Sequence, residues 1–287
     1  MNAVIDSALL QHTHQRGWKA SLELRFEARA ARSVLSHNLH QGPLRVQRAL
    51  YPEGDAVCQV LMLHPPAGIA GGDELRVSID VAEGAHAQVT TPGAGKWYKS
   101  LGPLATQDIL LNVADGATLE WLPQEVIVFD QAQARASTTI RLAEGACCIG
   151  WDILCLGRQA SGEDFVSGSF RQRLRLERPD GTPLWQEAMH LTGGDPAMRA
   201  AAALNDHRVF ATLWIAGKHD APALVEALRT LDIRNGVCGV SALPHATIVR
   251  LLAHSAENAR EYLEAAWALA RPRLTGREAA HPRIWKT

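Results

Sequence analysis

The segment Val81-Ala82-Glu83-Gly84-Ala85 returns twice along the chain, as Val113-Ala114-Asp115-Gly116-Ala117 and as Leu142-Ala143-Glu144-Gly145-Ala146. The three copies share the order apolar residue, Ala, acid, Gly, Ala, and they begin 32 and 29 residues apart. Each copy follows one strand-like run and precedes another, and an acid–glycine pair favours a turn. The repeat predicts stacked β layers built from a recurring unit.

Alternation of apolar and polar residues supports this β interpretation in the first two thirds of the chain. Such alternation is typical of half-buried strands, and it occurs at Leu22–Ala28, Glu74–Val81, Thr139–Leu142 and Phe170–Glu177. After about Gly193 the pattern changes to mixed elements. There we expect a short helix at Ala200–Leu204, strands at Arg208–Ala216, Cys238–Ala242 and Thr247–Ala253, a helix starting at Asp220–Pro222, and a helix capped by Ser255 that ends before Pro272.

The patterns together predict a mainly β fold, a layered, β-helix-like stack of strands with about two helices toward the C-terminal half. No low-complexity linker interrupts the chain, so we expect a single domain over residues 1–287. Residues 1–17 are expected to form a mobile segment and residues 271–287 an irregular tail.

Composition excludes several classes of protein. The chain has 287 residues, 29 basic and 30 acidic, and a net charge of −1, which gives no overall field for nucleic acid or an anionic membrane. No signal peptide or membrane-spanning run is present, so we expect a cytoplasmic protein. The five cysteines include no C-x-x-C pair and are interpreted as reduced, mostly buried thiols rather than a zinc site.

A proline- and glycine-rich loop, His64-Pro65-Pro66-Ala67-Gly68-Ile69-Ala70-Gly71-Gly72-Asp73, joins two strand-like segments. Prolines fix φ, and glycines permit backbone angles closed to other residues. A hairpin needs far fewer residues, so the sequence indicates a shaped, ordered loop. Such loops often build a site or a contact surface, but from the loop alone a plain glycine-rich corner of a β protein is the favoured interpretation. His64 opens this loop and Asp73 closes it.

Two carboxylates fall inside apolar strand-like runs. Asp152 lies within Cys148–Leu156, and Glu187 follows Trp185. A carboxylate in such a place costs free energy unless it is paired, hydrated or holding a metal. The pair therefore suggests a wet internal passage or a site, and pairing with an arginine such as Arg158 or Arg173 is the alternative.

Other chemical motifs are weak. The stretch Thr90–Lys96 ends in Gly-Lys, but Thr90 stands where a phosphate-binding loop needs its first glycine and Trp97 follows the lysine. Glu125 and Glu163 are further acids beside apolar or turn segments.

Five stretches, taken in order, resemble the UreD-type (also called UreH) urease accessory protein family. Two departures occur: Ala67 stands where the family commonly has glycine, and Gly95 stands where it often has threonine or serine before the lysine. The stretches are His64–Asp73, Thr90–Ser100, Trp121–Asp130, Trp151–Phe165 and the tail Arg271–Thr287.

The resemblance implies a non-enzymatic urease maturation factor that acts as a chaperone in nickel insertion. Such proteins bind the urease apoprotein and a UreF-type partner, and through that partner a UreG-type GTPase. The family also implies a tunnel for a transient nickel ion, with no permanently bound cofactor. Mapped onto this sequence, the tunnel candidates are Asp73, Asp152 and Glu187, with Glu125, Glu163 and His64 as further candidates.

Two other functions remain open from the sequence. One is an acid–base hydrolase that uses paired carboxylates, Asp73 with Asp152 or Glu187. The other is a pure interaction scaffold without metal contact.

Overall fold

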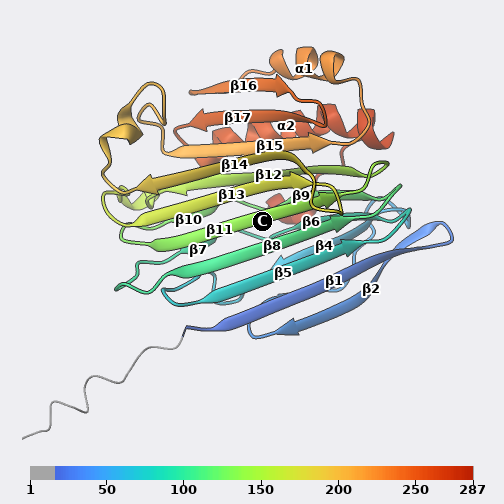
Figure 1. The fold of residues 1–287 in the computed structure, drawn as a ribbon, viewed down its shortest axis with the longest axis horizontal. Helices are drawn as coiled ribbons and strands as arrows, with labels where there is room; N and C mark the ends of the chain where they lie inside the picture. The colour runs from blue at the N-terminus through green and yellow to red at the C-terminus, as the bar shows by residue number, and fades with distance from the viewer. Residues whose placement is uncertain (1–16, 287) are drawn as a thin grey trace, which may run out of the picture.

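Two β-sheets packed face to face form the body of the computed structural model, which describes residues 17–286 (Figure 1). The front sheet has the strand order β14-β13-β11-β8-β5-β1-β2. The back sheet has the order β16-β17-β15-β12-β9-β6-β4-β3, with β7 and β10 attached beside β12. The front strands are β1 Lys19–Arg29, β2 Arg32–Gln41, β5 Glu74–Val81, β8 Ala105–Val113, β11 Gln133–Leu142, β13 Ser169–Glu177 and β14 Pro183–Thr192.

The back sheet is longer and continues past β14 in Figure 1. Its bounds are β3 Arg45–Val46, β4 Cys58–Leu63, β6 His86–Thr90, β7 Gly95–Trp97, β9 Thr118–Leu122, β10 Val126–Val128, β12 Cys147–Leu156, β15 Val209–Ala216, β16 Gly236–Ala242 and β17 Ala246–Ala253.

The chain passes alternately from one sheet to the other and so forms a coil of about four turns. Strands β1, β5, β8, β11 and β13 pair in parallel in the front sheet, and β4, β6, β9 and β12 pair in parallel in the back sheet. A short third side joins them, where Ile69 pairs with Trp97, and Val128 pairs with Trp97 and Leu156. The expected β-helix-like stack is confirmed.

The repeated Ala-acid-Gly-Ala segments form the corners between the two sheets. Each corner bonds to the turn beneath it: Ala114 N donates to Val81 O at 2.9 Å, and Ala143 N donates to Val113 O at 3.0 Å. The acid adds a further link, since Asp115 Oδ1 accepts from Gly145 N at 2.7 Å. The repeat in the sequence therefore sets the register of the stack.

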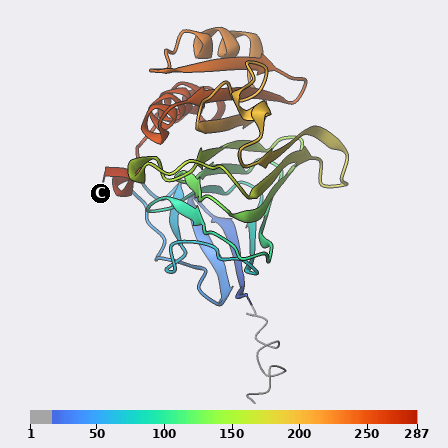
Figure 2. The same cartoon turned by 90° about the vertical axis from the view of Figure 1, so that its left-hand side faces the viewer.

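Two α-helices cover the outer face of the back sheet, on the side away from the front sheet (Figure 2). Helix α1 (Ala221–Arg229) begins after Asp220, and α2 (Ala256–Thr275) begins after Ser255; both caps accept a backbone N–H three residues on. These helix starts agree with the sequence prediction. Two hydrophobic cores result, one between the sheets and one beneath the helices.

Two expectations about the C-terminal third are wrong. Ala200–Leu204 forms turns after a 3-10 helix at Pro196–Arg199, rather than a helix. Helix α2 does not end before Pro272 but continues to Thr275, and a 3-10 helix at Arg283–Lys286 follows in the tail. The expected mobile segment 1–17 lies outside the described residues except for Gly17.

No helix within residues 17–286 is long and apolar enough to cross a membrane.

A buried ion pair holds α2 against the back sheet in the turn that contains Pro272. The Arg271 side chain is fully buried and donates from Nε to Glu120 Oε2 at 3.0 Å and from Nη1 to Glu53 Oε2 at 2.7 Å. Burial alone would raise the pKa of Glu120, but His86, at 2.7 Å, and Arg271 together hold that pKa below its usual value. The helix thus continues to Thr275 although an interior proline costs about 3 kcal/mol, and these contacts hold in place the turn that contains Pro272.

We expect Arg271→Met to lower the free energy of unfolding by about 3–5 kcal/mol, because it leaves the buried Glu120 carboxylate without its guanidinium partner. The double variant Arg271→Met, Glu120→Gln should recover a large part of that loss. Urea unfolding at pH 7 measures both. Equal stability of the wild type and Arg271→Met would contradict this role.

Candidate functional site

A cavity of about 380 Å³ lies between the two sheets beside the short third side. The loops after β4 and β6 form its rim, and β8 and β12 supply polar side chains from opposite sheets. Its polar lining comprises His64, Thr91, Lys96, Gln107, Gln124 and Asp152. The structure thus brings His64 and Asp152, which are far apart in sequence, to the same space.

Asp73 fastens the rim loop instead of pointing freely into the cavity. Its Oδ1 accepts from Trp18 N at 2.7 Å, and its Oδ2 accepts from Ala70 N at 2.8 Å. Ala67 adopts a left-handed φ of 61° in this loop, a conformation that glycine adopts without the steric cost of a Cβ. Gly68 packs so closely on Tyr98 that a Cβ would lie 2.4 Å from the ring. The loop is a shaped structure, as predicted.

His64 lines the cavity in its neutral form near neutral pH. Burial lowers the pKa of His64, and the negative charge of Asp73 only partly opposes this effect. A neutral imidazole has a free nitrogen lone pair, the form that binds metal ions.

The Asp152 carboxylate faces the space between the sheets. It lies on the inner side of β12, and Gln172 Nε2 on β13 of the opposite sheet donates to its Oδ2 at 3.2 Å. Burial raises the pKa of Asp152 to about 7, and the hydrogen bond from Gln172 offsets this only in part. Asp152 therefore exchanges its proton near neutral pH.

A polar row continues from Asp152 across the back sheet. Strand register places Thr212 of β15 beside Asp152, and Arg250 of β17 beside Thr212. The Thr212 hydroxyl is buried and has no hydrogen-bond partner within residues 17–286. A buried polar group in this state fits a hydrated or ion-accepting space better than a dry core.

Glu187 lies at the far end of this row and is paired. From β14 of the front sheet it accepts from Arg250 Nε at 2.6 Å, an ion pair that bridges the two sheets. Its carboxylate side chain is 18% exposed and the Arg250 side chain 45% exposed, so the pair marks a surface end of the row. The arginine partner differs from both that the sequence suggested.

Glu125 and Glu163 lie apart from the cavity. Glu125 Oε2 pairs with Arg260 of α2 at 3.3 Å. Glu163 accepts from Arg158 Nε at 2.7 Å and from Asp130 N at 2.9 Å. Neither carboxylate is among the cavity-lining residues.

Sequence reasoning missed four polar residues on the inner faces. Each carried a usable signal, because each interrupts the apolar positions of an alternating strand: Arg250, for instance, stands between Ile248 and Leu252. The residues are Gln107, Gln172, Thr212 and Arg250. No group of three or more His, Cys, Asp or Glu that could hold a metal occurs within residues 17–286.

Comparison with known proteins identifies the family of this chain. The family model for the UreD urease accessory protein matches residues 19–286. The chain belongs to the UreD urease accessory protein family. It is 50% identical over 281 residues to the urease accessory protein UreD of Dechloromonas aromatica (strain RCB), with 96% of this chain and 97% of that protein covered. It is 45% identical over 287 residues to UreD of Azoarcus sp. (strain BH72), with both chains fully covered.

Membership of the UreD family confirms the resemblance seen in the sequence and supports a role in urease maturation. It does not by itself assign the six predicted path residues. Their arrangement in the structure decides which of them share one space, and these are His64 and Asp152, with Glu187 at the end of the same polar row.

We expect Ala67→Gly to raise the free energy of unfolding by about 0.5–1 kcal/mol, because glycine adopts the left-handed φ without steric cost, partly offset by unfolded-chain entropy. Ala70→Gly in the same loop lacks that relief and should lower stability slightly. Thermal unfolding compares the two. Destabilisation by Ala67→Gly would contradict the strain at this position.

We expect Asp152→Asn to become more stable relative to the wild type as pH rises. The folded wild type keeps the Asp152 proton up to about pH 7, whereas the unfolded chain releases it near pH 4. The free energy of unfolding of the wild type therefore falls as pH rises across that window. Between pH 5 and pH 8 the free energy of unfolding of Asp152→Asn, relative to that of the wild type, should grow by up to about 2–3 kcal/mol. Urea unfolding at both pH values tests this, and a constant difference would count against it.

Proposed function

We propose that this chain is a non-enzymatic urease maturation factor that passes nickel between its two sheets to the urease apoprotein. In this proposal it binds the apoprotein and a UreF-type partner, and the UreG-type GTPase reaches the complex through that partner. Membership of the UreD family supports the maturation role. The cytoplasmic location expected from the sequence stays a prediction.

The observation that carries the nickel path is the position of Asp152. Its carboxylate stands between two sheets whose inner faces are otherwise largely apolar, beside a cavity and next to the unpartnered Thr212 hydroxyl. Nickel binds N, O and S donors, so a single carboxylate with neutral amide and hydroxyl neighbours offers a weak, reversible contact. A cargo ion needs such a contact, because tight binding would prevent release.

The Arg250–Glu187 ion pair, at the other end of the polar row from Asp152, also supports a nickel path. A cation that reaches Glu187 must compete with the guanidinium already bonded to it. Because the Arg250 side chain is 45% exposed to solvent, its displacement into water costs little free energy. Glu187 can therefore accept a cation transiently without becoming a storage site.

The arrangement of the acids disfavours the hydrolase alternative. Both Asp73 oxygens accept backbone N–H groups, and Glu187 is bonded to Arg250. Neither carboxylate is therefore free to form the acid–base pair with Asp152 that general acid–base catalysis requires.

We expect Asp152→Asn, Glu187→Gln to lower the nickel content of co-expressed urease at least about fivefold, because it removes the two carboxylate ligands of the path. The complex with urease should still co-purify. Metal analysis of purified urease, normalised to protein, gives the readout.

The matched control is Glu125→Gln, Glu163→Gln, which removes two carboxylates whose ion pairs lie outside the cavity. Its urease should keep nearly normal nickel. Normal nickel with the Asp152, Glu187 variant would refute the path and favour a scaffold without metal contact.

A further inference from the structure

A cluster of arginines stands on the outer face of the front sheet, away from the cavity. Strand β13 presents Arg171, Arg173 and Arg175 at alternate positions, so all three project outward. The parallel register places Arg135 of β11 beside Arg171, and the antiparallel register places His190 of β14 on its other side. We call Arg135, Arg171, Arg173 and His190 the arginine patch.

The patch is poorly neutralised within the chain. Arg135 has one distant partner, Asp108, at 3.7 Å, and Arg175 pairs with Glu177 at 2.6 Å. Arg171 and Arg173 are exposed and have neither an ion pair nor a side-chain hydrogen bond to the rest of residues 17–286. Like charges side by side on neighbouring strands oppose sheet formation, so folding alone does not favour this arrangement.

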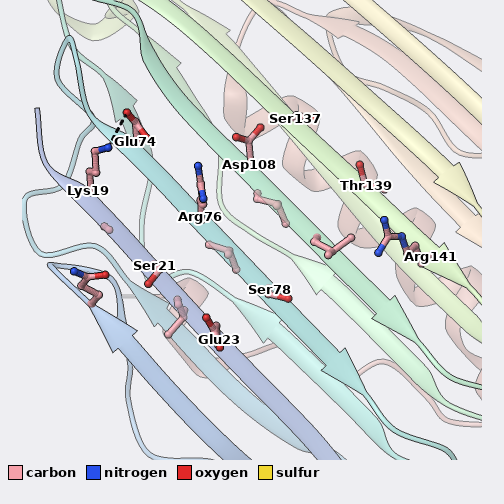
Figure 3. Close-up of a pocket in the computed structure, with 16 residues that line it drawn as sticks. Lys19, Ser21, Glu23, Glu74, Arg76, Ser78, Asp108, Ser137, Thr139 and Arg141 are labelled. Carbon is pink, nitrogen blue, oxygen red and sulfur yellow. Dashed lines mark ion pairs between the residues drawn. The ribbon is translucent and has the colours of Figure 1, made fainter. Parts of the chain in front are cut away.

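The other half of the same face has a different charge pattern. Figure 3 shows Lys19 and Glu74 as an ion pair on β1 and β5, with Glu23, Arg76 and Asp108 interspersed among serines. Positive and negative groups therefore alternate there. The net charge of the whole chain is −1, so the patch is a local concentration and not a consequence of a basic composition.

The shape and chemistry of the patch favour acidic protein over nucleic acid. A hollow of about 640 Å³ lies over it, lined by Asp108, Arg135, Arg171, Arg173 and His190 among others. Guanidinium groups bind carboxylates through two parallel hydrogen bonds, and arginines two residues apart on a strand match carboxylates at alternate residues of an extended segment. None of the exposed aromatic side chains that would stack bases lies among the residues of this hollow.

We propose that the arginine patch docks an acidic, extended segment of a protein partner, with Arg171 and Arg173 as the principal contacts. This inference goes beyond the proposed nickel path and does not require it. The patch lies on the opposite side of the front sheet from Asp152, so a partner bound here leaves the space between the sheets free.

A peptide of alternating Glu and Ser residues, labelled for fluorescence anisotropy, tests the proposal on the full chain at low salt. The matched variants are Arg171→Gln, Arg173→Gln and, at the other end of the same face, Arg25→Gln, Arg76→Gln. We expect the first to weaken peptide binding at least about tenfold and the second by less than about twofold. Added salt should weaken wild-type binding.

Three results would overturn the proposal. The first is wild-type binding no tighter than that of a Gln–Ser peptide. The second is equal loss in the two double variants. The third is tighter binding of a single-stranded oligothymidylate than of the Glu–Ser peptide, which would assign the patch to nucleic acid.

Thermal unfolding controls for folding, and the double variant Arg171→Gln, Arg173→Gln should unfold at a temperature no lower than that of the wild type. None of these readouts involves nickel, so they are independent of the proposed path.

Discussion

The parallel winding of the chain is the constraint on which the rest of the structure depends. Once each corner bonds to the corner below, the inner face of one sheet must oppose the inner face of the other over about four turns. Any polar residue at an inner position then lies between the sheets, where water is scarce. Asp152, Gln172 and Thr212 are placed together by this rule, although they belong to three strands and two sheets.

The two faces of the front sheet differ in their chemistry. Its inner face contributes Gln107 and Gln172 to a narrow polar space within an apolar core. Its outer face carries charge, balanced near β1 and β5 and unbalanced at the arginine patch. Strands β8 and β12 contribute Gln107 and Asp152 to the cavity from the two sheets, and the loops after β4 and β6 form its rim.

Much of the fold could be predicted because its signals are local. Alternation located β5 with its observed ends, and the Ala-acid-Gly-Ala repeat located the corners. Contacts between distant residues were not accessible in the same way. The sequence marked Asp152 and Glu187 as unusual, but it did not show that Arg250, 63 positions from Glu187, would neutralise it. The sequence placed the end of α2 too early because the penalty of Pro272 is a local signal. The ion pair that holds this part of the helix joins Arg271 to Glu120, 151 positions away, and could not be read from the sequence.

The central claim is that the space around Asp152 admits a divalent cation. Anomalous diffraction from crystals soaked in nickel at pH 8, where the carboxylate is ionised, tests it most directly. We expect a nickel peak between the sheets within coordination distance of Asp152, and no such peak in crystals of Asp152→Asn. Peaks confined to surface histidines, with the region around Asp152 filled only by side chains, would contradict it.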